Sequence, residues 1–399
     1  MIINMRVKGI KALKGLPPFV YVLALVTVLG LSAGLYRLYA GLGQTTNLNT
    51  VFPWGLWISF DLTTVAFSGA AFTLAALVYI FHMHDLHSAI RPTVLFGLLG
   101  YSSVLAILFF DLGRWDRFWH FLVYPNLTSA LFEVSWCIAI YTAILVYEFS
   151  PVLLEKVKDN KRLLGIVEKI TIPMVIAGIT LSSMHQSSLG SLFVITAPRL
   201  NPLWYSIIQP EFFLVSSLAA GISTIIIGSF ASIWLFGQTL DQKAIGKLGL
   251  LLPWILGLYL IMKIGELAFS GAFRLLFTSG VLSVLYLSEL VLGVIVPILL
   301  FSMRRVRASR GASVIGALFV AGGIVLNRFD VTWFAIRQLN GVGYFPSWIE
   351  VTLLIGVSAG VLLIYTLVAH FFPVFAETVR LKPASARASS SLDPAGSVN

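Results

Sequence analysis

Long apolar segments dominate this 399-residue chain and limit what it can fold into. Apolar residues make up 58% of the sequence and charged residues 11%, whereas soluble domains carry roughly 25% charged residues. A helix needs about 20 apolar residues to cross the hydrocarbon core of a bilayer. We therefore predict an all-α integral membrane protein.

Ten segments satisfy this length requirement, and prolines and glycines separate most of them. The first segment follows a cluster of four basic residues, as a signal peptide would. It is longer than the usual h-region of about 7–15 residues, so we interpret it as a retained first span. The approximate bounds of the ten predicted spans are 17–39, 56–81, 92–110, 128–150, 164–184, 211–237, 248–270, 279–302, 312–328 and 347–373.

The 27 Lys and Arg residues are distributed unevenly between the two sides of this arrangement. With the N-terminus in the cytoplasm, 19 of them lie on the inner side, 7 on the outer side, and Lys263 within a span. The positive-inside rule therefore favours both termini in the cytoplasm. One span more or fewer would scramble this pattern, so it also supports ten spans. We assign the net charge of +10 to orientation in the bilayer rather than to nucleic-acid binding.

The two ends of the chain are expected to lie outside the bilayer. Residues 1–16 would form a cytoplasmic N-terminal segment and residues 17–375 the polytopic membrane domain. Residues 376–399 would form a cytoplasmic tail, and its richness in serine and alanine predicts disorder.

The outer connections are long and rich in aromatic residues. Seven of the ten tryptophans lie in them or at the adjacent helix ends. An interfacial aromatic belt would populate both membrane faces, so this excess indicates a binding surface on the outer side. The seven are Trp54, Trp57, Trp115, Trp119, Trp204, Trp333 and Trp348.

Charged side chains inside the spans need a reason, because each costs roughly 2.5–3.5 kcal/mol at mid-bilayer on insertion scales. Lys263 and Glu266 are three residues apart and could neutralise each other on one helix face. Glu289 could be either a proton-path residue or a hydrogen-bonded buried acid. Asp61 and Glu133 lie in the outer half. The candidates for a proton path are Asp61, Lys263, Glu266 and Glu289.

The densest group of polar residues follows the fifth span. Residues 184–192 contain one histidine, one glutamine, three serines and one glycine, where the helix is expected to leave the lipid. His185 and Gln186 would end that span on the outer side, the side on which Trp54 also lies. We predict that this stretch forms part of a quinone pocket, with Gln186 and Trp54 among its binding residues.

The third span ends on the same side at Asp111, with Gly113 as the helix stop and Arg114 as a candidate ion-pair partner. Such a pair alone would be an ordinary helix terminus. A quinone needs an apolar slot for its tail, hydrogen bonds to two carbonyls, and a group that exchanges protons. Histidine and a partly buried carboxylate suit the last task. We therefore predict that His185, Asp111 and Glu133 line the site. Arg114 would anchor Asp111 or polarise a carbonyl.

The chain offers few ligands for a redox centre of its own. Cys137 is its one cysteine, whereas an iron–sulfur cluster needs about four ligands. His82, His84 and His87 cluster at an inner helix end, where we interpret them as solvated. We expect no haem, no iron–sulfur cluster and no metal in this chain, so that electrons would come from a partner.

Several motifs resemble those of the NrfD/PsrC-type membrane subunits. They are Phe52-Pro53-Trp54-Gly55-Leu56-Trp57 followed by Phe60-Asp61, then Phe110-Asp111-Leu112-Gly113-Arg114, Leu131-Phe132-Glu133 and the His185–Leu192 stretch. The resemblance covers about residues 15–375. It is closest to the ten-span HybB-like subunits of hydrogenases, and the DsrP-like subunits are similar as well.

The resemblance implies two four-helix bundles plus flanking helices in a prokaryotic inner membrane. It also implies a site for menaquinone or ubiquinone near the outer face, opposite a ferredoxin-like iron–sulfur subunit. In HybB-like members that subunit connects to a periplasmic [NiFe]-hydrogenase, and in others to a molybdopterin enzyme or a sulfur-metabolism module. The motifs place Asp111, Glu133 and His185 in the quinone region, and Asp61 and Glu266 become candidates for proton conduction.

Three functions are therefore open. The chain would be a quinone-reactive anchor that passes electrons between an iron–sulfur partner and the quinone pool, with or without proton translocation. A hydrogenase link is the first choice and a sulfur-metabolism complex the alternative. A secondary transporter would often have broken helices at mid-membrane, whereas these polar residues cluster near one face. A purely structural anchor would not need Asp61, Glu133 and Glu266 in lipid.

Overall fold

The computed structural model describes residues 17–155, 161–196, 199–336, 342–375 and 379–380. The predicted cytoplasmic segment 1–16 lies outside the described residues. So does the predicted tail 376–399, apart from the two residues 379–380.

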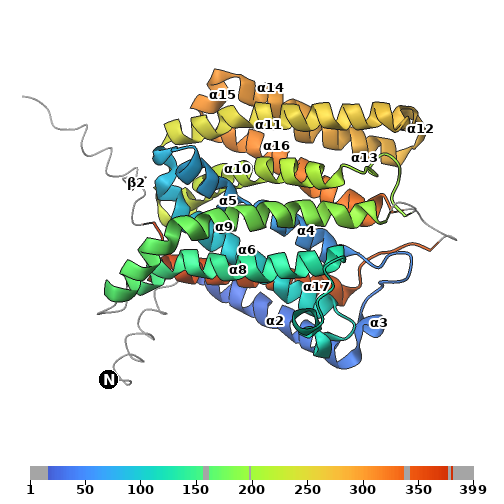
Figure 1. Ribbon diagram of the computed structural model, residues 1–399, viewed down its shortest axis with the longest axis horizontal. Helices are drawn as coiled ribbons and strands as arrows, with labels where there is room; N and C mark the ends of the chain where they lie inside the picture. The colour runs from blue at the N-terminus through green and yellow to red at the C-terminus, as the bar shows by residue number, and fades with distance from the viewer. Residues whose placement is uncertain (1–16, 156–160, 197–198, 337–341, 376–378, 381–399) are drawn as a thin grey trace, which may run out of the picture.

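Long helices that lie side by side make up almost all of the described chain (Figure 1). Within the described residues, nine helical segments are long and apolar enough to cross a membrane. The 34-residue helix α9 adds a tenth, so each predicted span corresponds to one segment. The protein is a multi-pass membrane protein. The ten segments are α2 (Pro18–Ala40), α4–α5–η1 (Leu56–Ser68, Ala70–Ala75 and Ala76–Ile80), η2–α6 (His84–Ala89 and Ile90–Asp111), α8 (Ala130–Leu154), α9 (Lys161–Val194), α10 (Gln209–Phe236), α11 (Gln242–Phe269), α13–η5–α14 (Val281–Leu290, Val291–Ile295 and Val296–Ser302), α16–η6 (Arg310–Phe329 and Asp330–Phe334) and α17 (Trp348–Phe371).

Short elements connect the spans. They are α3 (Leu42–Thr45), η3 (Trp115–Arg117), α7 (His120–Val123), η4 (Ala272–Arg274), α12 (Leu275–Thr278) and α15 (Arg304–Ala308), with two strands, β1 (Gln238–Thr239) and β2 (Val379–Arg380). The strands pair antiparallel, with Gln238 opposite Arg380.

The ten segments form two four-helix bundles, as predicted. The first bundle contains α4–α5, α6, α8 and α9, and the second contains α10, α11, α13–α14 and α16. Helix α10 also packs against α4, α5 and α9, and thereby joins the bundles. Helices α2 and α17 pair with each other, and α17 packs against α6 of the first bundle (Figure 1).

Glycines permit the closest helix contacts. A Cβ atom on Gly30 of α2 would lie 2.4 Å from the Cα atom of Gly356 on α17. Gly293 of η5 and Gly323 of α16 face each other in the same way. A Cβ atom added to Gly293 would lie 2.5 Å from the Cα atom of Gly323. Small residues of this kind let helix backbones approach within a bilayer, where apolar burial alone does not drive association.

The two ends of the bundles differ. The long-loop end carries the connections that follow α2, α6, α9, α11 and η6, whereas the connections at the opposite end, the basic end, carry most of the charge. The described cations at the basic end include Arg91, Lys243, Lys247, Arg304, Arg305, Arg307 and Arg310.

Two helices extend further towards the long-loop end than predicted. The fifth span was expected to end at 184, but α9 continues to Val194, so His185 lies inside the helix, about 14 Å from its end. The ninth span was expected to end at 328, but helical structure continues through η6 to Phe334, so Asp330 lies inside it. Both predictions were wrong because the polar residues there face the protein interior rather than water.

Candidate functional site

His185 lies at the centre of the first bundle. Its side chain is 1% exposed, and neither ring nitrogen has a hydrogen-bond partner in the protein. The ring centroid lies 5.7 Å from that of Tyr101 on α6. Buried polar groups are nearly always hydrogen-bonded, so two unpaired nitrogens indicate a site for water or a ligand.

Gln186 fixes the position of His185 relative to α4. Its side-chain Nε2 donates a 2.9 Å hydrogen bond to the carbonyl oxygen of Val65. Asp61 lies four residues before Val65, which is one helical turn nearer the long-loop end. Asp61 is 4% exposed, and both of its carboxyl oxygens also lack a protein partner. The structure thus brings two unpaired proton-exchanging groups to adjacent helices.

Glu133 joins α8 to the same stretch of α9. The Ser188 hydroxyl donates to Glu133 Oε1 at 2.5 Å. Glu133 is exposed and lies three residues after the start of α8, so it sits nearer the long-loop end than His185 does. The predicted neighbourhood of Glu133 and residues 184–192 is therefore confirmed as a direct contact.

Asp111 does not pair with Arg114, contrary to the predicted anchoring. Arg114 binds Asp116 at 2.8 Å in an exposed ion pair, which lowers the pKa of Asp116 to about 2. Asp111 instead lies half-buried within electrostatic range of Arg37 on α2, and of Asp61. The prediction was wrong because Arg114 follows the helix end and points into the exposed connection.

Arg37 was not among the predicted site residues. It is fully buried, and its Nη2 donates to the carbonyl oxygen of Leu112 at 2.6 Å. Its Nε and Nη1 atoms have no protein partner. Arginine in the last turn of a span is usually interfacial, so no local pattern predicts that packing of α2 against α6 and α17 buries Arg37.

Glu350 is a buried carboxylate whose hydrogen bonds are satisfied within the protein. It accepts hydrogen bonds from the backbone N–H groups of Asn47 and Ser347, at 2.9 and 3.0 Å, and from the Tyr344 hydroxyl. The Ser347 hydroxyl in turn caps the first turn of α17. Glu350 therefore ties two connections to the start of α17 and has no free oxygen to offer a ligand.

Trp54 packs at the junction between the bundles. Its ring lies edge-on to Phe193 of α9 at 5.6 Å, and Phe193 lies 5.4 Å from Phe213 of α10. The predicted binding residue is thus half-buried beside the last turns of α9 rather than free on the surface.

The second bundle contains a separate ionic group. Lys263 Nζ lies 3.6 Å from Glu289 Oε1, and both side chains are 2% exposed. The predicted pairing of Lys263 with Glu266 was therefore wrong, because Lys263 reaches across to α13 while Glu266 is half-buried. Glu289 also accepts hydrogen bonds from Trp204 at 3.0 Å, from Tyr259 at 3.2 Å and from Asn327 at 2.9 Å. It is a hydrogen-bonded buried acid, the second of the two interpretations.

Two further charges of this bundle were missed by sequence reasoning. Arg328 is buried, with its guanidinium 3.6 Å from the ring centroid of Phe213 and Nη2 donating to the Ser216 hydroxyl at 2.8 Å. Asp330 is 0% exposed, and neither carboxyl oxygen has a protein partner. It starts η6, one of three π-helical segments in the described part of the chain, and such segments occur often at functional sites.

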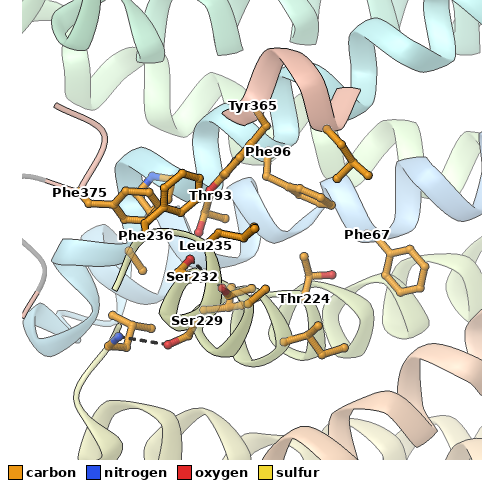
Figure 2. A pocket seen from close by; sticks show the side chains of 18 of the residues that line it. Phe67, Thr93, Phe96, Thr224, Ser229, Ser232, Leu235, Phe236, Tyr365 and Phe375 are labelled. Atoms are coloured by element: carbon orange, nitrogen blue, oxygen red, sulfur yellow. Dashed lines mark hydrogen bonds between the residues drawn. The ribbon is translucent and has the colours of Figure 1, made fainter. Parts of the chain in front are cut away.

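A cavity of about 390 Å³ lies towards the basic end, between α6, α10 and α17. The rings of Phe67, Phe96, Phe236, Tyr365 and Phe375 line it (Figure 2). Two of its hydroxyls donate to their own helix, Thr224 to the carbonyl of Ala220 and Ser232 to the carbonyl of Gly228, both at 2.8 Å. The lining suits an apolar chain, whereas the unpaired polar groups lie elsewhere.

Comparison with known proteins places this architecture in a family. The family model described as polysulphide reductase, NrfD, matches residues 44–340. The chain belongs to the NrfD family. Among its relatives, the probable Ni/Fe-hydrogenase 2 b-type cytochrome subunit of Escherichia coli is 31% identical over 344 residues, which cover 85% of this chain and 87% of the relative.

Two other relatives come from Nitratidesulfovibrio vulgaris. The menaquinone reductase integral membrane subunit is 28% identical over 390 residues, covering 87% of this chain and 90% of the relative. A second protein from this organism is 35% identical over 368 residues, which cover 88% of this chain and 93% of the relative. Over most of its length this NrfD-family chain is thus similar to membrane subunits of redox complexes. In the part of the chain that the structure describes, no three His, Cys, Asp or Glu residues form a group that could hold a metal ion.

Proposed function

We propose that this chain is the quinone-binding membrane subunit of a multisubunit oxidoreductase and passes electrons between an iron–sulfur partner subunit and the quinone pool. The observation that carries the proposal is that His185 on α9 and Asp61 on α4 are both buried and that neither ring nitrogen and neither carboxyl oxygen has a protein partner. The Gln186–Val65 hydrogen bond joins these two helices. The relative named menaquinone reductase integral membrane subunit supports the choice of ligand.

The residues around His185 fit a quinone. A quinone carbonyl needs a hydrogen-bond donor, and a neutral imidazole or a protonated carboxyl supplies one. Bound there, a quinone would take up or release two electrons and two protons. His185 and Asp61 would exchange those protons, while Gln186 holds α9 in register with α4. Glu133 and Asp111 lie nearer the long-loop end, where they would pass protons between this pair and solvent.

A haem does not fit the same residues. The Escherichia coli relative is named as a b-type cytochrome subunit. A bis-histidine haem between helices needs two imidazoles that face each other within the membrane. All six histidines of the chain are in the described residues, and His185 is the buried one.

The partner would dock at the long-loop end. Trp115, Trp119, Phe345 and Trp348 are exposed large aromatic residues at this end. Exposed apolar patches of this kind mark protein contacts. The positive-inside rule puts the basic end in the cytoplasm of a prokaryotic inner membrane, with both termini there and the docking face outside. We propose a hydrogenase complex first, as in the Escherichia coli relative, and a sulfur-metabolism complex second.

The test is quinone-linked turnover of the complex that co-purifies with the chain. His185→Gln and Asp61→Asn should each lower electron transfer to a soluble quinone analogue at least 100-fold, while the partner's activity with a soluble dye is retained. His370→Gln, an exposed histidine at the basic end, is the matched control and should behave as wild type. Unchanged quinone turnover in both site variants would contradict the proposal.

A further inference from the structure

The aromatic cavity between α6, α10 and α17 is partly open to the surface of the protein (Figure 2). Leu235 of α10 and Leu362 of α17 line it and are themselves 50% and 56% exposed. Both residues belong to helices that are long and apolar enough to cross the membrane. The opening between them therefore faces lipid, and a molecule of the bilayer can enter it.

Three groups of helices meet at this cavity. Helix α6 belongs to the first bundle, α10 and Ala321 of α16 belong to the second, and α17 belongs to the flanking pair. The volume of about 390 Å³ falls within the range of roughly 300–1,000 Å³ that is typical of ligand pockets. An empty apolar cavity lowers stability in proportion to its volume. An occupant would therefore stabilise the junction of all three groups.

The lining of the cavity favours a hydrocarbon chain over a polar ring. Ser229 Oγ accepts the backbone N–H of Leu240 at 3.1 Å, and the hydroxyls of Thr224 and Ser232 donate to carbonyls of their own helix. Most of the other lining side chains are hydrocarbon. Apolar cavities of this kind exclude water and bind apolar molecules.

Arg310 places a positive charge beside the cavity at its basic end. Its Nη2 donates to the carbonyl oxygen of Leu240 at 3.3 Å, and Leu240 lines the cavity. Its Nε donates to Gln242 Oε1 at 3.2 Å. Within the described part of the chain, Arg310 forms no ion pair, and no residue accepts a hydrogen bond from its Nη1. A guanidinium group suits a phosphate, because it offers several N–H donors in one plane.

Further cations surround Arg310. Gln242 Nε2 donates to the carbonyl oxygen of Arg307 at 3.0 Å, which holds the start of α11 against α15. Asp241 is the acidic residue next to Leu240, and five cations on α11, α15 and α16 outnumber it. They are Lys243, Arg304, Arg305, Arg307 and Arg310. Basic pockets between membrane helices on the cytoplasmic side bind anionic lipid headgroups, and the positive-inside rule puts the basic end on that side.

We propose that this cavity binds an anionic phospholipid. One acyl chain lies among the rings of Phe96, Phe236 and Tyr365, and the phosphate binds Arg310 at the basic end. The other acyl chain stays in the bilayer. The bound lipid fills the junction between the two bundles and α17. The site is separate from His185 and Asp61, so it does not depend on the proposed quinone function.

The experiment is intact mass spectrometry of the full chain with any chains that co-purify. The detergent-washed sample receives equal amounts of phosphatidylglycerol and phosphatidylcholine with identical acyl chains. Wild type should retain phosphatidylglycerol at least tenfold over phosphatidylcholine. Gly228→Phe should lose this lipid, because Gly228 lines the cavity and a Cβ atom there has no atom within 4 Å. Gly257→Phe on α11 is the matched control, since a Cβ at Gly257 also has no atom within 4 Å.

The charge is tested separately. Arg310→Gln should lower the preference for phosphatidylglycerol at least threefold, because the phosphate loses its guanidinium partner. Lys169→Gln, which removes an exposed cation of α9, is the matched control and should keep the wild-type preference.

Several outcomes would overturn the proposal. The intact mass in the same spectrum shows whether a variant has assembled, and Gly228→Leu replaces Gly228→Phe if the phenylalanine prevents assembly. Equal retention of both lipids by wild type would mean that the lipid binds without recognition of its headgroup. Wild-type retention of phosphatidylglycerol in the Gly228 variant, or an unchanged preference in Arg310→Gln, would also contradict the site. Loss of a retained quinone in place of a phospholipid would assign the cavity to an isoprenoid tail instead.

Discussion

Gln186 of α9 donates a 2.9 Å hydrogen bond to the carbonyl oxygen of Val65 on α4, one helical turn from Asp61. This bond fixes the neighbouring His185 against the helix that carries Asp61. Both groups are buried and lack protein partners, although burial of an unpaired polar group is unfavourable. A bound quinone or water would supply the hydrogen-bond partners that His185 and Asp61 lack.

Gln186→Leu should weaken quinone binding more than it weakens the fold. The Val65 carbonyl also accepts the Gly69 N–H at 3.0 Å, so it keeps one partner when the glutamine is lost. The expected loss of stability is therefore about 0.5–1.5 kcal/mol, the value of one net hydrogen bond. We expect the KM for quinone to rise several-fold. An unchanged KM together with a large drop in melting temperature would show that Gln186 is only structural.

Lys263→Met and Glu289→Gln should each destabilise the detergent-solubilised complex strongly. Removal of one partner leaves the other charge buried and uncompensated, which costs about 3–5 kcal/mol. The double variant should recover much of that loss, since no charge is then left alone. Thermal unfolding of the three variants measures the coupling. If the single variants are as stable as wild type, Lys263 and Glu289 are both uncharged in the wild-type protein, which would contradict this prediction.

Arg114→Ala should leave quinone turnover within twofold of wild type. Arg114 pairs with Asp116 in the exposed connection, and the hydrogen bond and charge of Arg114 lower the pKa of Asp116 to about 2. Asp116 is therefore ionised throughout the neutral range, and its attraction to Arg114 is lost only as the pH falls towards 2. Arg37→Gln, in contrast, removes the buried cation near Asp111 and should lower turnover. Equal losses in both variants would contradict this assignment.

Gly356→Ala should loosen the contact between α2 and α17. The added Cβ would lie 2.3 Å from the Cα atom of Gly30, which is backbone and cannot rotate away. Overpacking of this kind typically costs about 1–3 kcal/mol. Gly265→Ala, at a position with no atom within 4 Å, is the control. A melting temperature that falls equally in both variants would indicate a backbone effect rather than a clash.

The ten spans could be predicted because the length of an apolar run is a local property. The two-bundle arrangement was expected only from the resemblance to the NrfD/PsrC-type subunits. The sequence could not predict which charged side chains pair with each other. Lys263 binds Glu289 across two helices, while Glu266, three residues away on its own helix, was the partner that local spacing suggested. Arg37 was expected at the membrane interface, because the sequence around a residue does not reveal whether neighbouring helices bury it.

The depth predicted for the polar stretch was wrong, and its role in quinone binding stays a prediction. The polar stretch at 184–192 was expected at a membrane boundary, since polar residues usually end a span. In the structure, Gln186 and Ser188 bind groups on adjacent helices, so the helix continues.

Photoaffinity labelling with an azido-quinone, followed by peptide mapping of the intact complex, tests the central claim most directly. The quinone ring should label residues 61–68 of α4 and residues 182–189 of α9, and His185→Gln should abolish the labelling. Labels confined to the aromatic cavity around Phe236 and Tyr365, or to the second bundle around Glu289, would contradict the proposed quinone site.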